Sequence, residues 1–241
     1  MRLETMTWIE VEAYLRRSAG VILPTGSMEQ HGPLGLIGTD AICAREMAWA
    51  AADHCEAIVA PELAYAPAPF NMSFPGTVSL DATLFRQVAR QVMGSLAHHG
   101  FRKIYVLNGH GANLEPLREA AEGVEAEVRI RSWWDFDGVN TLRQAWYGDW
   151  EGMHATPSEV AVTQHTHRII EDPDLPPPRK LTSDFIKAHA GDKHGPPDAH
   201  RRDFPDGRVG SHSALARPEQ GRQLIETAAQ EIAADYRAFT A

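Results

Sequence analysis

The order of apolar patterns constrains the fold of this chain more than any other feature of its sequence. Short apolar runs typical of buried strands alternate with longer stretches in which apolar residues recur at helical spacing. The expected strands are 21–23, 57–63, 103–107 and 128–131, and the expected helices are 40–54, 82–99 and 113–122. This alternation predicts an α/β protein with a mostly parallel central sheet and helices on both faces, a three-layer α/β/α arrangement.

Local signals mark where several of these elements begin and end. Thr7 has the spacing of a capping box with the glutamate three residues later, and Asp81 is placed to cap the helix that follows it. Gly100 is expected to end that helix, and Pro24 is expected to end the first strand. The stretch 218–241 has the amphipathic spacing of a final helix.

The size of the chain suits one compact unit. It has 241 residues, of which 43% are hydrophobic, and we expect a single domain over residues 1–241. Residues 173–210 are rich in Pro, His, Asp and Arg and show little periodicity. We expect this stretch to form an irregular arm or a long loop, which is a candidate for a subunit interface.

Charge and cysteine content exclude several classes of partner. The formal net charge of −9 at pH 7 argues against nucleic acid or an anionic membrane as the main partner. No stretch approaches the ~18–20 uninterrupted apolar residues of a membrane span, and the first residues lack the apolar core of a secretory signal. Cys43 and Cys55 do not form a C-x-x-C pair, which favours reduced thiols in a cytoplasmic protein.

The stretch LPTGSMEQHGPLGLIGTD, residues 23–40, places acidic and imidazole side chains among glycines and prolines. Glu29 and His31 stand two residues apart, and such neighbours project to the same side of an extended backbone. Asp40 follows at the start of the next helix. Taken alone, the pattern fits two solvated loop residues and an N-cap better than it fits a site.

Two further segments add similar side chains. His110 directly follows the expected strand 103–107 in the sequence NGHGAN, where glycines permit close backbone approach. Because the carboxyl ends of parallel strands share one edge of a sheet, this loop and the 23–40 loop are expected to meet. In WEGMHATPSE the proline suits a first helical turn and places Glu159 one turn beyond His154. A helix cap is an equally good explanation of Glu159.

Together these segments offer a set of potential metal ligands: His31, His110, Glu29, Glu159 and Asp40, with His154 nearby. Imidazole and carboxylate ligands without thiolate suit Zn²⁺, Mn²⁺ or Fe²⁺. Five ligands exceed what one catalytic ion uses while it keeps an open position. They suit two divalent ions roughly 3.5–4 Å apart, with one carboxylate between them.

Five motifs in order along the chain resemble the signature of the creatininase (creatinine amidohydrolase) family. They are EQHG with TD (29–32 and 39–40), NMSFPGT (71–77), NGH (108–110), SWWDF (132–136), and a histidine with a glutamate five residues on (154 and 159). A weaker similarity lies at 207–221. The resemblance implies a three-layer α/β/α fold, often assembled into hexamers, with a site for two metal ions.

The resemblance also implies which residues bind the ions. The five implied ligands are Glu29, His31, Asp40, His110 and Glu159. Asp40 would bridge the two ions. It would bind one ion together with Glu29 and His110, and the other ion together with His31. Creatininase itself has a glutamate at the position of Ala112. Many relatives use instead the acidic residue that matches Glu159, which we expect to be the fifth ligand.

The implied reaction is hydrolysis of a non-peptide C–N bond in a small-molecule amide, cyclic like creatinine or similar, by a hydroxide that bridges two ions. His154 is the expected general acid for the leaving nitrogen. Trp134 and Trp150 match tryptophans that flank the creatininase substrate pocket, although ordinary core packing also explains them. Gly111 stands where creatininase has a tyrosine, so the identity of the substrate stays open. The alternatives are a formamide hydrolase acting on a pyrimidine intermediate, a peptidase of this family, or a non-catalytic metal-binding protein.

Other histidines lie at helix ends or in the expected arm, and we expect them at the surface or at interfaces. They are His98, His99, His165, His167, His189, His194, His200 and His212.

Overall fold

The central sheet has four parallel strands in the order β2-β1-β3-β4. The computed structural model describes residues 1–191 and 193–241. The strands are β1 (Gly20–Thr25), β2 (Ile58–Val59), β3 (Lys103–Asn108) and β4 (Glu127–Ser132). Every neighbouring pair runs parallel. The predicted parallel sheet is therefore confirmed.

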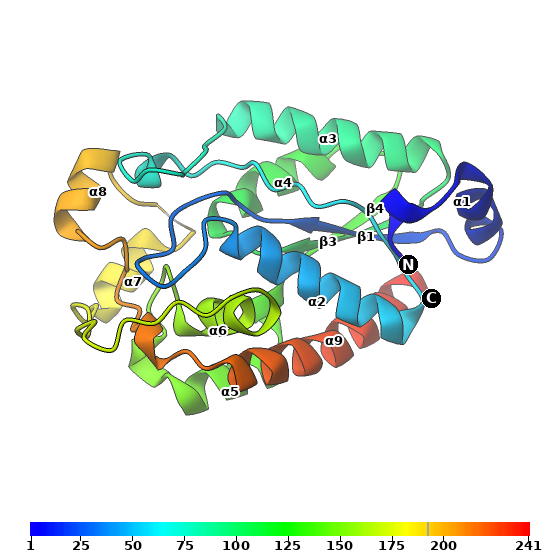
Figure 1. The fold of residues 1–241 in the computed structure, drawn as a ribbon. Helices are drawn as coiled ribbons and strands as arrows, with labels where there is room; N and C mark the ends of the chain where they lie inside the picture. Colours follow the sequence, from blue (N-terminus) through cyan, green and yellow to red (C-terminus); the bar gives the residue numbers. More distant parts are fainter. Residues whose placement is uncertain (192) are drawn as a thin grey trace.

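Helices cover both faces of this sheet (Figure 1). One face carries α3 (Ala82–His98) and α4 (Leu114–Ala121). The other carries α2 (Thr39–Cys55), α5 (Asp137–Trp146), α6 (Pro157–Thr166) and α9 (Pro218–Thr240). The short helix α1 (Trp8–Leu15) lies at the amino end of β1. The three-layer α/β/α arrangement is thus the one expected from the alternation of patterns.

Alternate residues of the buried strands face the two helical layers. Ile22 and Tyr105 belong to the core that α2 and α9 cover, together with Met47 of α2. Val21 and Ile104, their sequence neighbours, belong to the core under α3 and α4. Because side chains alternate along a strand and both faces are covered, each strand reads as a continuous apolar run.

The first two strands differ in length from their predictions. β1 continues through Pro24 to Thr25, although a proline removes a ladder donor. The Pro24 carbonyl accepts a hydrogen bond from the Leu63 amide. The proline nitrogen faces the same side of β1 as this carbonyl, beyond the end of β2. β2 covers only Ile58–Val59, but the chain stays beside β1 as far as Leu63, which forms an isolated parallel bridge with Thr25.

The predicted helix caps and the predicted helix end at Gly100 are confirmed. Thr7 and Glu10 form both hydrogen bonds of a capping box at the start of α1. The Asp81 side chain accepts hydrogen bonds from two amides of α3. Gly100 follows α3 with a φ of 109°, a conformation that favours glycine.

The expected irregular arm contains two short helices, α7 (Ser183–His189) and α8 (Pro197–Asp203). The description of 173–210 as wholly irregular is therefore wrong for these two segments. α8 is held by tertiary contacts: Asp198 accepts a hydrogen bond of 2.6 Å from Ser73, and Arg201 donates to the Ser73 carbonyl. A helix this short is marginal by itself, which is why periodicity did not reveal it.

Both cysteines of the chain lie in α2. Cys43 is buried and Cys55 is half-buried, and both are free. Within the described ranges, none of the helices is both long and apolar enough to cross a membrane.

Glycines permit the start of α2 to touch the end of β3. A Cβ added to Gly109 would lie 2.3 Å from the carbonyl oxygen of Asp40, and one added to Gly26 would lie 2.3 Å from the Ala41 amide nitrogen. Contacts this short are forbidden, so the backbone would have to move. Both glycines are thus required for the position of Asp40.

We expect Gly109→Ala to destabilise the protein by about 1–3 kcal/mol, the usual cost of overpacking, in urea unfolding. The matched control is Gly94→Ala in α3, where an added Cβ meets nothing within 4 Å. That variant is expected to be neutral or to stabilise by up to about 1 kcal/mol, because alanine favours helix. Equal behaviour of the two variants would contradict the packing argument.

Candidate metal centre

The predicted ligands meet at the carboxyl ends of β1 and β3. Glu29 and His31 lie in the loop after β1, and Asp40 lies in the first turn of α2. His110 follows β3, and Glu159 is in the first turn of α6. All five side chains are buried. The sheet edge therefore brings together residues that are far apart in the sequence: Glu29 and Glu159 are 130 positions apart.

Asp40 lies between two imidazole rings. Its Oδ1 is 2.9 Å from Nε2 of His31, and its Oδ2 is 3.0 Å from Nδ1 of His110. The same His110 nitrogen is 3.2 Å from Oε1 of Glu29. One carboxylate thus faces a different histidine with each of its oxygens.

Backbone carbonyls fix which nitrogen of each ring points inward. Nδ1 of His31 lies 3.1 Å from the Glu29 carbonyl oxygen, and Nε2 of His110 lies 2.7 Å from that of Pro67. A carbonyl oxygen only accepts, so these ring nitrogens carry protons and donate. In the neutral rings, Nε2 of His31 and Nδ1 of His110 keep lone pairs, as a metal ligand requires.

The electrostatics of the cluster favour positive charge. Burial opposes charge on His31, but the Asp40 carboxylate outweighs it and raises the pKa of His31 to about 10. Burial likewise opposes charge on Asp40, yet His31 and His110 lower the pKa of its carboxyl. The carboxylates of Asp40 and Glu29, whose pKa values are lowered by the neighbouring histidines, therefore remain ionised at neutral pH and attract cations.

Two inward carboxylate oxygens have histidine nitrogens, and no amide or hydroxyl donor, beside them among the described residues. Oε1 of Glu29 and Oδ2 of Asp40 are buried, and they lie 3.2 and 3.0 Å from Nδ1 of His110. A buried carboxylate oxygen is unfavourable unless a cation or a donor meets it. Together with the inward ring nitrogens, these oxygens form a donor set that fits a divalent cation.

The described residues form three overlapping groups whose ligand atoms lie within 4.8 Å of one another. The groups are Glu29 with Asp40 and His110, His31 with Asp40 and Glu159, and Glu29 with His31 and His154. Glu29, His31 and Asp40 each belong to two of them. All predicted ligands are thus brought together.

Glu159 caps a helix and also lies among the potential ligands. Its Oε2 accepts hydrogen bonds of 2.9 Å from the Thr156 amide and 2.7 Å from the Thr156 hydroxyl, which completes a capping box for α6. The carboxyl also belongs to the group with His31 and Asp40. Burial raises the pKa of Glu159 to about 7.

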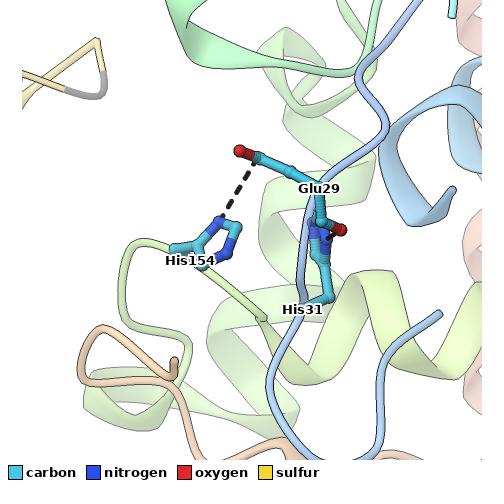
Figure 2. Close-up of side chains that lie close together, drawn as sticks. All are labelled: Glu29, His31 and His154. Atoms are coloured by element: carbon cyan, nitrogen blue, oxygen red, sulfur yellow. Dashed lines mark hydrogen bonds and ion pairs between the residues drawn. The ribbon is translucent and has the colours of Figure 1, made fainter. Parts of the chain in front are cut away.

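His154 enters the cluster from the turn before α6. Its Nε2 donates to the Gln30 carbonyl at 2.6 Å, so Nδ1 of the neutral ring is the free nitrogen. Nδ1 lies 3.6 Å from Oε1 of Glu29, and Figure 2 shows the two side chains facing each other beside His31. Burial lowers the pKa of His154 to about 3, so the ring is neutral at pH 7.

The cluster opens into a cavity of about 180 Å³. Trp134 and Gly111 line it, together with Arg143 of α5. Trp150 is not among the described lining residues. Its ring packs 5.4 Å from that of His212 and lies under the ammonium group of Lys180. The cavity wall thus includes one of the two predicted tryptophans.

One family model decides the relationship of this chain to known proteins. The Creatininase model, described as creatinine amidohydrolase, matches residues 4–236. The chain belongs to the creatininase family.

Relatives of this creatininase-family chain have different activities. Creatinine amidohydrolase of Pseudomonas putida is 27% identical, over 95% of this chain and 93% of that protein. The mycofactocin precursor peptide peptidase of Mycolicibacterium smegmatis is 36% identical, over 47% of this chain and 48% of that protein. A solved structure of creatininase with Mn has a TM-score of 0.80 at 23% identity and covers 99% of this chain and 98% of that chain. The last comparison shows a shared fold.

Two supporting residues of this creatininase-family site escaped the sequence reasoning. Asn71 donates from Nδ2 to Oε2 of Glu29 at 2.8 Å, and Gln30 donates from Nε2 to Oδ1 of Asn71 at 2.8 Å. This chain of amides leaves Oε1 as the inward oxygen of Glu29. The NMSFPGT motif was the available signal for Asn71, but a motif alone does not show what its residues contact.

The arm histidines include one clear exception to the expected surface position. His200 of α8 is buried, and its ring lies 4.9 Å from that of Phe70. Phe70 in turn packs edge-on against His154, with ring centroids 5.9 Å apart. The expectation of a surface or interface position is therefore wrong for His200 within this chain.

The two roles of Glu159 are separable by substitution. Glu159→Gln keeps an oxygen for the Thr156 donors and removes a charge that burial disfavours, so the metal-free protein should be at least as stable as wild type. Glu159→Ala removes the cap and should cost about 0.3–1.5 kcal/mol. Thermal unfolding of metal-free samples measures both. A Gln variant as unstable as the Ala variant would contradict the capping geometry.

Proposed function

We propose that this chain is an amidohydrolase that binds two divalent ions, Zn²⁺, Mn²⁺ or Fe²⁺, at the cluster. The observation that carries the proposal is that Asp40 faces a different histidine with each of its oxygens, one histidine in each of two groups of potential ligands. The first ion would be held by Glu29, Asp40 and His110. The second would be held by His31, Asp40 and Glu159, which makes Glu159 the fifth ligand in a chain that has Ala112.

The chemistry of such a site is hydrolytic. Two bound divalent ions lower the pKa of water toward ~7 and polarise an amide carbonyl. Mixed imidazole and carboxylate ligands suit these ions, and the buried, inward-facing oxygens of Glu29 and Asp40 support their presence.

His154 is the proposed proton carrier. Its predicted role is general acid for the leaving nitrogen, and because burial keeps the ring neutral at pH 7 the proton that it donates must be taken up during the reaction. Nδ1 accepts a proton from the attacking water and then donates that proton to the leaving nitrogen, while Nε2 stays bound to the Gln30 carbonyl. The neighbouring Glu29 carboxylate stabilises the protonated ring in between.

The proposed substrate is a small non-peptide amide, cyclic like creatinine or similar in size. A cavity of about 180 Å³ is smaller than the ~300–1,000 Å³ that drug-sized ligands occupy. The similarity to creatinine amidohydrolase along nearly the whole chain supports a cyclic amide. Trp134 would provide an apolar wall for a planar ring, and Trp150 remains a prediction as a second one. A formamide on a pyrimidine intermediate is a variant of the same reaction.

A second candidate is cleavage of a peptide. The mycofactocin precursor peptide peptidase of Mycolicibacterium smegmatis is 36% identical over the part it matches, whereas the creatinine amidohydrolase is 27% identical over nearly the whole chain. That match spans about half of both proteins. It supports peptide cleavage as a candidate activity but does not establish it.

We also propose a homo-oligomer, with a hexamer as the family resemblance implies. The segment 65–88 supports this because it exposes a series of large apolar side chains: Tyr65, Met72, Val78, Leu84 and Val88. Such surfaces on a single chain often mark interfaces. A cytoplasmic location stays a prediction from composition.

The main proposal is tested by metal content and metal removal. We expect elemental analysis to find two divalent ions per chain, and a chelator to abolish hydrolysis until Zn²⁺, Mn²⁺ or Fe²⁺ is added back. A panel of cyclic amides, formamides and short peptides separates the candidate substrates. Full activity in metal-free protein would exclude the proposal, and bound metal without hydrolysis of any class would favour the non-catalytic alternative.

The role of His154 has its own test. His154→Ala should keep both ions and reduce turnover by roughly 10²–10⁴-fold, as loss of a proton-transfer group does. Metal content and kcat are measured on the same preparation. Loss of an ion from the variant would instead make His154 a ligand, as its group with Glu29 and His31 also permits.

A further inference from the structure

The cavity contains a cationic side chain that the proposed reaction does not use. Among the described residues that line it, Arg143 carries the one lysine or arginine charge. The other charged lining residues are the carboxylates Glu29, Asp40 and Glu159. An arginine beside a metal cluster of this kind has no ligand role, because guanidinium cannot coordinate a cation. It is suited instead to an anionic group.

The Arg143 guanidinium is held rigidly at the cavity wall. Its Nε donates to Oε1 of Glu151 at 2.9 Å, and its Nη1 donates to Oδ1 of Asn140 at 2.9 Å. The group also lies over the ring of the buried Trp133, 5.4 Å from the ring centroid. With the side chain 18% exposed, little conformational freedom remains to be lost when a ligand binds.

The same hydrogen bonds join Arg143 to the tryptophan of the cavity wall. Asn140 donates from Nδ2 to the Trp134 carbonyl at 2.6 Å while it accepts from Arg143. Trp134 and Arg143 both line the cavity. An apolar ring and a cationic group are therefore presented to a ligand as one connected unit.

The remaining terminal nitrogen of the guanidinium is the part available to a ligand. Nη2 of Arg143 makes no hydrogen bond to any described residue, whereas Nε and Nη1 each make one. Nη2 and Nη1 are adjacent donors in the plane of the guanidinium, and each nitrogen carries two hydrogens. This spacing matches the two oxygens of a carboxylate.

We propose that Arg143 forms a carboxylate subsite, so that the substrate carries a free carboxylate in addition to the amide that is cleaved. This inference rests on the proposed function, because it assigns the substrate class of the same site. Two kinds of molecule share this chemistry. One is a small N-acyl amino acid, and the other is a peptide whose C-terminal carboxylate enters the cavity.

A purely structural role for Arg143 makes a different prediction. Glu151 also accepts from the Ser158 hydroxyl at the start of α6, so the ion pair could simply connect α5 to that helix. In that case, breaking the ion pair from either side would have the same effect. Glu151→Gln keeps the guanidinium and breaks the charge pair, which makes it the matched control.

The test is calorimetric binding of N-acetylglycine and its neutral isostere N-acetylglycinamide to the metal-loaded protein. Hydrogen bonds to charged groups contribute about 1.5–3 kcal/mol, so Arg143→Gln should weaken binding of the acid by about 10–150-fold and leave the amide unchanged. Glu151→Gln should bind the acid at least as well as wild type. Lys180→Gln, which removes a cation from beside Trp150, should change neither affinity.

Three results would overturn the proposal: equal losses for acid and amide, no loss for the acid, or the same loss in Glu151→Gln. Hydrolysis of dipeptides with a free or an amidated C-terminus, beside that of the N-acyl amino acids, then identifies the source of the carboxylate. An acid preference that depends on Arg143 without hydrolysis of any compound would refute the proposed function and leave the subsite standing.

Discussion

The carboxylate of Asp40, held between His31 and His110, is the interaction on which the site depends. Its oxygens lie 2.9 and 3.0 Å from ring nitrogens that come from two different strand ends. This contact requires α2 to start against the end of β3, which Gly26 and Gly109 permit. The position at the first turn of a helix also favours a negative charge. Fold and chemistry therefore meet in one buried side chain.

Backbone carbonyls give the site its directionality. His31, His110 and His154 each donate one ring proton to a carbonyl oxygen, at 3.1, 2.7 and 2.6 Å. The second nitrogen of each ring is thereby turned toward the cluster. Since these carbonyls belong to irregular segments, the glycines and prolines that break regular structure are what make such orientation possible. The loops after β1 and β3 thus position His31 and His110.

Much of the fold was readable from the sequence because it follows from local rules. Apolar periodicity placed the strands, and the side chains of Thr7 and Asp81 capped their helices as expected. α7 and α8 were not readable, because helices this short are marginal by themselves, and α8 is held by contacts with the distant residue Ser73. The candidate ligands were found by residue type and motif. Asn71 and Gln30 were not, since their contacts are with partners remote in sequence, and Arg143 was not, since only the fold places it at the cavity.

The sequence by itself determined the donor types and their order: carboxylates and imidazoles without thiolate, each following a strand or opening a helix. Tertiary structure alone decided which nitrogen of each ring faces inward, and that Glu159 both caps α6 and faces His31. It also decided that Trp134 and Arg143 line the cavity while Trp150 packs against His212. The reason is physical: residue type fixes what a side chain can bind, but only packing between distant segments fixes what it meets.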